Sequence, residues 1–333
     1  MDGHLKARVA DYQQSDPRAS LQQLATSIGL FVLACALMYR ALDISYALTL
    51  ALSVPAAGFL VRIFIIQHDC GHGAFFKTRR LNDLVGAICS VMTLTPYRNW
   101  RRQHAGHHRS WNNLDLRLAG SDIYSTCLTV GEYRALTWRH RWLYRLTRHR
   151  AISNLVLPPL VFLLLYRVQF DTPKTWKRDR RSVYWTDLAI GAVGIALGLE
   201  LGFRQVLLVQ VPVMALASII GVWLFSVQHR FEHALWARQP EWSTTSASLR
   251  GSSYLRLPKL LQWFSGNIGF HHVHHLNPRV PNYRLQECHD GIPELRATPI
   301  LTLRSALLSP ALALWDEDRQ KLVSFADLRG HAF

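Results

Sequence analysis

Apolar residues of this 333-residue chain are gathered into long runs, separated by polar and basic segments. A helix needs about 20 consecutive apolar residues to cross the hydrocarbon core of a bilayer. Four runs are long enough, and they predict membrane-spanning helices at residues 24–42, 45–66, 183–203 and 205–227. Residues 67–182 and 228–333 are then expected to form a helical cap. We therefore predict one all-α integral membrane domain over residues 1–333.

Three other apolar stretches are too short or too interrupted to span. Residues 84–96 are too few, and residues 152–166 contain Pro158 and Pro159, which break a spanning helix. We predict that both stretches form helices lying in the membrane interface. Residues 298–315 contain Arg304 and Pro310, and this broken pattern predicts a cap helix on the membrane surface.

Histidine is concentrated in three segments beside the predicted spans: HDCGH at 68–72, HAGHH at 104–108 and HHVHH at 271–275, here called the first, second and third boxes. Spacings of three and four residues place side chains on one face of a helix. The fourth span ends in SVQHRFEH, which adds a further histidine at the same edge. Nine candidate metal ligands result, which are too many for one ion and suit two: His68, His72, His104, His107, His108, His229, His271, His274 and His275. His233, four residues after His229, is a tenth candidate.

A common site requires the three boxes to lie on one side of the membrane. Four spans meet this requirement, whereas a crossing by residues 152–166 would separate the first two boxes from the third. Lys and Arg number 3 in residues 1–23, 20 in residues 67–182 and 12 in residues 228–333, of 38 in all, so these segments are predicted to be cytoplasmic. The net charge of +16 then reflects topology and attraction to anionic lipid headgroups rather than nucleic-acid binding.

The boxes and their contexts QHDCGHGAFF and GNIGFHHVHHLNPRVPNYRL resemble the membrane fatty acid desaturase family over about residues 55–290, in particular its bacterial acyl-lipid omega-6 (delta-12) branch. The resemblance implies a mushroom-shaped protein with four transmembrane helices and a cytoplasmic cap around a non-haem di-iron centre. The box histidines would bind iron, with His229 as the remaining ligand, while the position of His233 more often carries another residue in such proteins. Imidazole alone suits Zn, Cu, Fe and Ni alike, so iron rests on the resemblance.

The implied reaction uses two iron ions and O2 as co-substrate to remove two hydrogens from neighbouring carbons of a lipid-linked fatty acyl chain. A cis double bond and water are the products. Three residues are candidates for orienting the ligating imidazoles: Asp69 beside His68, Glu232 near the VQH segment, and Asn267 four residues before His271.

Electrons are expected to come from outside the chain. It has no dinucleotide fingerprint and no CxxC pair, and its five cysteines are scattered, as suits a reducing cytoplasm. A small acidic redox protein such as ferredoxin is the expected partner on the basic face. These features predict a protein of the bacterial inner (cytoplasmic) membrane, with its termini and active site facing the cytoplasm.

Two other readings of the boxes stay open. The same histidine architecture serves membrane hydroxylases and ketolases of lipids, alkanes or carotenoids, which insert oxygen instead of removing hydrogen. A divalent-metal transporter or haem electron carrier is a further alternative. Transport is disfavoured because the histidines lie at the ends of spans rather than near the bilayer midplane.

Overall fold

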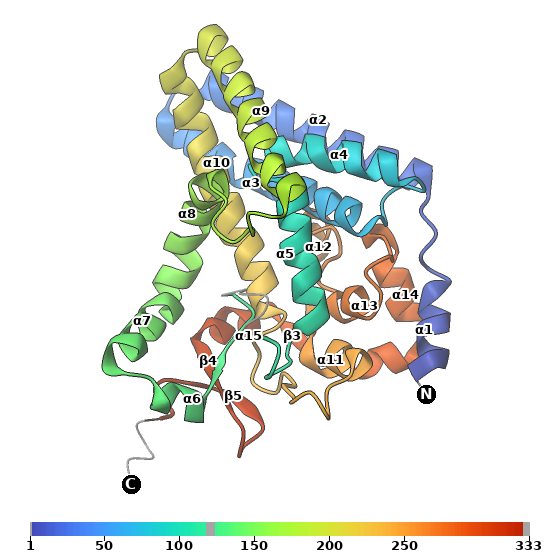
Figure 1. Ribbon diagram of the computed structural model, residues 1–333. Helices are drawn as coiled ribbons and strands as arrows, with labels where there is room; N and C mark the ends of the chain where they lie inside the picture. The colour runs from blue at the N-terminus through green and yellow to red at the C-terminus, as the bar shows by residue number, and fades with distance from the viewer. Residues whose placement is uncertain (1, 118–123, 329–333) are drawn as a thin grey trace.

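The computed structural model describes residues 2–117 and 124–328 of the chain (Figure 1). Four of its helices are long and apolar enough to cross a membrane, as predicted: α2 (Pro17–Ala41), α3 (Tyr46–His72), α9 (Lys177–Leu201) and α10 (Phe203–Val227). Many leucines on these helices are exposed, as expected of a lipid-facing surface; Leu199, for example, is 76% exposed. The chain is an integral membrane protein.

The ends of the spanning helices follow local sequence signals. Helix α2 starts at Pro17 after Asp16, whose carboxylate accepts the Arg18 N–H, so this helix begins earlier than the apolar run alone predicts. Helix α3 continues beyond the predicted end at residue 66 and stops at Gly73, which adopts a left-handed φ of 72°. The first box therefore forms the last turns of a spanning helix.

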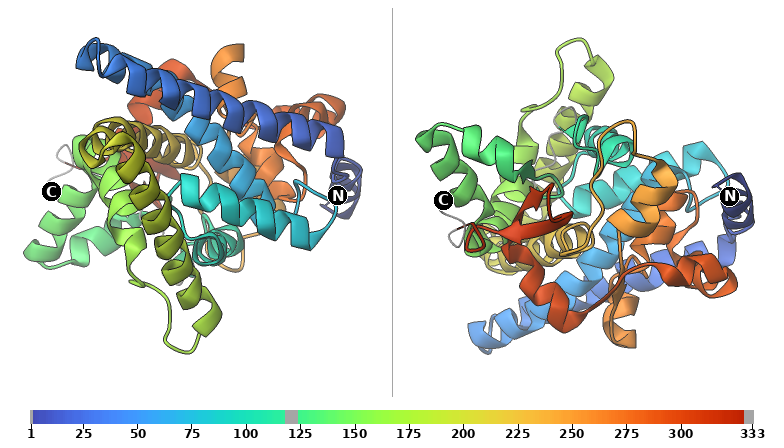
Figure 2. Two further views of the ribbon diagram at one scale, coloured as in Figure 1. Left: turned by 90° about the horizontal axis from the view of Figure 1, so that it is seen from above. Right: turned by 90° about the horizontal axis from the view of Figure 1, so that it is seen from below.

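Helix α3 is the central element of the bundle. It packs against α2, α10 and the shorter α4 (Arg79–Met92), as the view from above shows (Figure 2). The core between these helices is apolar and includes the fully buried Met38, Ala56, Ile63 and Ile66. Because α3 is held by three neighbours, the histidines at its end are carried on a rigid support.

The two predicted interfacial stretches do not form spans of their own. Helix α4 has 14 residues, with Val85 and Cys89 buried and Leu84 and Ile88 exposed. Residues 152–166 form a π-helical turn, η2 (Ile152–Val156), then α8 (Leu157–Leu163) and the start of the 3-10 turn η3 (Leu165–Arg167).

Helix α7 (Trp138–Arg148) and residues 152–167 would count as a fifth span only if taken together, and they are bent by 57° at their junction. The site geometry excludes such a crossing. The second box and the third box touch, with His107 Nε2 3.4 Å from His275 Nε2. Helices α9 and α10 already provide two crossings between these boxes, so a third would leave them on opposite sides of the bilayer.

The cap is mainly helical, as predicted, but it also contains short strands. Its remaining helices and turns are α1 (Asp2–Ala10), α5 (Tyr97–Ser110), α6 (Val130–Ala135), α11 (Thr244–Gly251), α12 (Lys259–Phe264), α13 (His271–Leu276), η4 (Asn282–Arg284), α14 (Leu285–Gly291), η5 (Pro293–Ala297), α15 (Leu303–Leu308) and η6 (Ser309–Ala311). Two small sheets have the orders β1-β4-β5 and β2-β3, from β1 (Leu128–Thr129), β2 (Tyr254–Arg256), β3 (Ile300–Thr302), β4 (Leu312–Asp316) and β5 (Lys321–Ser324).

The predicted helix over residues 298–315 is wrong for most of its length. Within this range only α15 is an α-helix. It lies between strands β3 and β4 and is followed by the 3-10 turn η6. Strand β3 pairs in parallel with β2, and β4 pairs with both β1 and β5. Strands β1 and β2 are remote in sequence from their partners, so tertiary pairing overrides the local helical pattern.

The contact between α4 and α5 generates a stability prediction. A Cβ added at Gly86 would lie 2.3 Å from the ring of Tyr97, which is 3% exposed and cannot move freely. We expect Gly86→Ala to destabilise the protein by about 1–3 kcal/mol and to lower its thermal midpoint in nanodiscs.

Gly29→Ala is the matched control, because it lies in helix α2 with nothing within 4 Å of the added Cβ. It should be neutral or stabilise by up to about 1 kcal/mol. Equal midpoints for the two variants would contradict the described packing of α4 on Tyr97.

Candidate metal centre

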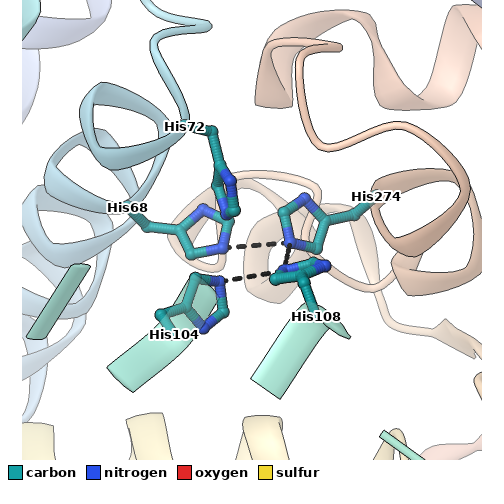
Figure 3. Close-up of side chains that lie close together, drawn as sticks. All are labelled: His68, His72, His104, His108 and His274. Atoms are coloured by element: carbon teal, nitrogen blue, oxygen red, sulfur yellow. Dashed lines mark hydrogen bonds between the residues drawn. The ribbon is translucent and has the colours of Figure 1, made fainter. Parts of the chain in front are cut away.

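Five histidines from three helices point their rings toward one point at the cap end of α3 (Figure 3). His68 and His274 approach to 3.1 Å between their Nε2 atoms, and His274 and His108 to 3.0 Å. His108 Nε2 also lies 3.1 Å from His104 Nε2. The ring centre of His72 is 4.8–5.0 Å from those of the other four members. We call this set the five-histidine group: His68, His72, His104, His108 and His274.

A second set surrounds His229, which follows the end of α10. Its Nε2 atom lies 3.1 Å from His107 Nε2, 3.0 Å from His271 Nε2 and 3.1 Å from His275 Nε2. We call this set the four-histidine group: His107, His229, His271 and His275. The groups adjoin, since the rings of His108 and His275 stack with centres 4.4 Å apart. The structure therefore brings together all nine histidines that the spacing singled out.

Burial lowers the pKa of six of these imidazoles, all of which lie outside the spanning helices. His107, His229 and His275 are buried, and His104 and His108 are half-buried. For His229 and His275, desolvation first, then repulsion from neighbouring histidines, lowers the pKa well below its ordinary value. The same two causes lower the pKa of four further members of the two groups, namely His104, His108, His271 and His274. Their lone pairs are thus free for a metal at neutral pH.

The donor set fits two metal ions better than a hydrogen-bond network. An imidazole nitrogen has either one proton or one lone pair, so His229 Nε2 cannot hydrogen-bond to three other Nε2 atoms at once. A metal–imidazole bond of about 2.1 Å places neighbouring ligand nitrogens about 3.0 Å apart around a six-coordinate ion. The observed spacings match that arrangement in both groups.

Asp69 lies where a carboxylate can orient a ligating histidine. Its Oδ1 atom is 3.1 Å from His68 Nδ1, and its Oδ2 atom accepts hydrogen bonds from the Asn282 backbone N–H (2.7 Å) and side-chain Nδ2 (2.8 Å). Asn282 Oδ1 in turn accepts a hydrogen bond from Gln23 of α2. A chain of buried hydrogen bonds therefore links a spanning helix to one histidine.

Other residues also contact the site histidines, and two of them, Ser125 and Trp100, were not predicted from the sequence. Ser125 lies 3.2 Å from His107 Nδ1, Trp100 stacks on His104 at 4.8 Å, and Trp111 packs on His275 at 4.2 Å. Trp100 precedes His104 by four residues, a spacing that could have indicated it. Nothing local marks Ser125 or the NPRVPN segment that carries Asn282.

Three sequence candidates lie away from the histidine groups. Glu232 is exposed, and its carboxylate accepts a hydrogen bond of 2.7 Å from Lys321, so the structure does not place it beside the nine histidines. The cause is that α10 ends at Val227 and the chain turns, which sends residues 229 and 232 in different directions. His233 is likewise exposed, and the structure does not bring it into either group. Asn267 contacts Asn282 rather than a histidine, because its Nδ2 atom donates a hydrogen bond to the Asn282 carbonyl.

This geometry defines a class of helical membrane protein in which clustered histidines that could hold metal ions lie at the end of the spans. Comparison with known proteins identifies the family: residues 45–305 match the family described as fatty acid desaturase. The chain belongs to the fatty acid desaturase family and is an oxidoreductase. The transporter and haem-carrier readings are thereby set aside.

The sequence similarity to three known proteins covers between 69% and 98% of the chain. A fatty acid desaturase from Bacillus subtilis (strain 168) is 45% identical over 98% of this chain and 91% of its own length. An sn-1 oleoyl-lipid 12-desaturase from Anabaena variabilis is 26% identical over 71% of this chain and 66% of its own. An sn-1 acyl-lipid omega-3 desaturase (ferredoxin) from Nostoc sp. (strain 36) is 28% identical over 69% of this chain and 63% of its own.

The contact between Asp69 and His68 generates a prediction. Asp69→Asn keeps the size of the side chain but removes the charge that faces His68 Nδ1. Loss of such an orienting carboxylate typically costs about 10–100-fold in metal affinity, and we expect a loss of that size in chelator-competition titrations.

Glu232→Gln is the control, because Glu232 bonds to Lys321 at the surface and should not alter metal affinity. A similar loss in both variants, or in neither, would show that the Asp69 contact does not orient the site.

Proposed function

We propose that this protein introduces a cis double bond into a lipid-linked fatty acyl chain at a di-iron centre, with delta-12 (omega-6) regiochemistry. The observation that carries the proposal is the pair of adjoining imidazole groups at the end of the spanning helices. We assign one iron ion to the five-histidine group and the other to the four-histidine group. Asp69, and Asn267 through Asn282, are proposed to position the ligands.

A metal oxidant is needed because of the substrate. A methylene of an acyl chain offers no acidic proton, leaving group or electrophile to ordinary side chains. When bound, the two irons with O2 supply the oxidising power that removes two hydrogens from adjacent carbons. The chain's own residues supply the ligands, hold them in place and exclude water.

The placement of the centre suits a substrate that stays in the bilayer. The first box ends α3, and His229 follows α10 by two residues. An acyl chain lying between spanning helices can therefore reach the ligand groups without crossing bulk water. The packed rings of Trp100 and Trp111, 7% and 4% exposed, close two sides of the site.

We infer that the centre and both termini face the cytoplasm of a bacterial inner membrane. The excess of Lys and Arg in the N-terminal and cap segments supports this orientation. All five cysteines are free and buried, which suits a reducing compartment. A soluble one-electron donor such as ferredoxin is the proposed partner, since the Nostoc relative carries that donor in its name.

Regiochemistry is the finer part of the proposal. The box contexts resemble the omega-6 branch, and a 12-desaturase is among the relatives. An omega-3 desaturase is similar to a comparable degree, at 28% identity against 26%. The product itself must therefore decide between the two positions.

Expression in a host that makes only saturated and monounsaturated lipids tests the function directly. We expect new dienes with the second double bond at the delta-12 position, measured by gas chromatography and mass spectrometry of the fatty acids. Products that gain oxygen would instead identify a hydroxylase or ketolase.

Two histidine variants distinguish a role in the proposed metal centre from a position on the protein surface. His107→Ala removes a member of the four-histidine group and should abolish the dienes. His233→Ala removes an exposed histidine outside both groups and should leave them unchanged. Persistent dienes in His107→Ala would contradict the proposed ligand set.

A further inference from the structure

Two tryptophans extend outward from the four-histidine group. The ring of Trp111 lies 4.2 Å from that of His275, and the ring of Trp242 lies 6.0 Å from that of Trp111 in an edge-to-face arrangement. The Trp242 Nε1–H also donates a hydrogen bond of 3.1 Å to the Trp111 carbonyl. Trp111 is 4% exposed and Trp242 is half-buried, so the pair connects the buried site with the surface.

This surface lies on the cap, away from the spanning helices. Trp111 directly follows α5, and Trp242 ends the turn that precedes α11. Helix α11 is at the end of the molecule opposite to the junction of α9 and α10 (Figure 1). A soluble protein can therefore approach Trp242 without entering the bilayer.

The turn that carries Trp242 is held in place. The Trp242 backbone N–H donates a hydrogen bond of 3.0 Å to the Arg238 carbonyl. The Arg238 guanidinium bridges Asp115 at 2.8 Å and Glu317 at 2.9 Å, so it joins the turn to two other cap segments. Trp242 is thus presented by a fixed loop.

A second aromatic contact of the site leads elsewhere. Trp100 stacks on His104 of the five-histidine group and also meets Phe64 of α3. Phe64 contacts Phe162 of α8, so this series of rings runs along a spanning helix toward lipid. The Trp111–Trp242 pair, by contrast, runs toward water.

The proposed reaction needs electrons from an external donor, and these must reach the buried histidines. Formation of each double bond removes two acyl hydrogens, and with O2, two further electrons and two protons it yields two waters. Electron tunnelling weakens steeply with distance and is faster through packed rings and hydrogen bonds than across gaps. A carrier that docks beside Trp242 would be linked to His275 by two ring contacts and one hydrogen bond.

We propose that the surface around Trp242 is the docking site of a soluble one-electron carrier, and that Trp111 conducts its electrons to the four-histidine group. Two carriers are each oxidised by one electron per double bond, and the indoles make and break no bonds. This inference rests on the proposed desaturase function with an external donor. The two tryptophans have different roles: Trp242 contributes to docking and conduction, whereas the buried Trp111 contributes to conduction alone.

The test uses the iron-loaded protein in nanodiscs with reduced ferredoxin as the probe. Donor affinity is measured by calorimetry, donor oxidation by stopped-flow absorbance, and double-bond formation with either ferredoxin or dithionite and methyl viologen as reductant. Trp242→Ala should weaken ferredoxin binding and slow ferredoxin oxidation several-fold. Trp111→Leu should leave ferredoxin affinity unchanged and slow its oxidation several-fold.

Trp242→Ala should retain wild-type iron content and wild-type turnover with the small viologen reductant, which reaches the site without docking. Because Trp111 packs on His275, the rates of Trp111→Leu are compared with each other, and its turnover with ferredoxin should fall several-fold further than its turnover with viologen. Trp185→Leu is the matched control, because Trp185 is 68% exposed on spanning helix α9. It should match the wild type in every assay.

Unchanged ferredoxin oxidation in Trp242→Ala overturns the proposal, whatever the behaviour of the buried variant. An equal loss with ferredoxin and viologen overturns it too, because that pattern indicates a structural role. If the wild type forms no double bond with either reductant, the desaturase proposal itself fails, which is a separate outcome.

Discussion

Nine imidazoles that point their nitrogens at one another cannot satisfy themselves by hydrogen bonding, and this constraint governs the structure. His229 Nε2 has three Nε2 neighbours within 3.1 Å but only one bond to give or accept. Buried polar atoms without partners are costly, so the groups favour positive ions between them. Binding of those ions would then stabilise the cap, because the four-histidine group alone joins α5, the end of α10 and α13.

The membrane adds a second constraint, which the sequence already expresses. Imidazoles from the second and third boxes can meet only if an even number of crossings separates them, and α9 and α10 supply two. Runs of apolar residues reveal such spans because the bilayer requires a minimum helix length. The three boxes could also be recognised in the sequence, because histidines spaced by three and four residues lie on one face of a helix. The number of spans and the nine converging histidines could therefore be predicted.

What surrounds the histidines depends on contacts between remote segments, and local patterns do not report these. Asn282 meets Asp69 across more than two hundred positions of chain, and Ser125 reaches His107 from a loop. Residues 300–302 and 312–316 form strands because they pair with β2 and β1 from other parts of the cap, although the pattern of residues 298–315 predicts a helix. Glu232 follows the VQH segment closely in sequence, but the chain turns after α10 ends at Val227, and its carboxylate meets Lys321 instead of a histidine. Asp69 contacts His68, its neighbour in sequence, within the part of α3 that continues through the first box.

The most direct test of the account is the metal stoichiometry of the purified protein after anaerobic loading with Fe(II). Two ions per chain are predicted, falling when either histidine group is disrupted, as in His72→Ala or His271→Ala. Complete removal of the iron should abolish desaturation, and reloading should restore it. A single ion per chain, or full activity in the metal-free protein, would contradict a di-iron centre built from these nine histidines.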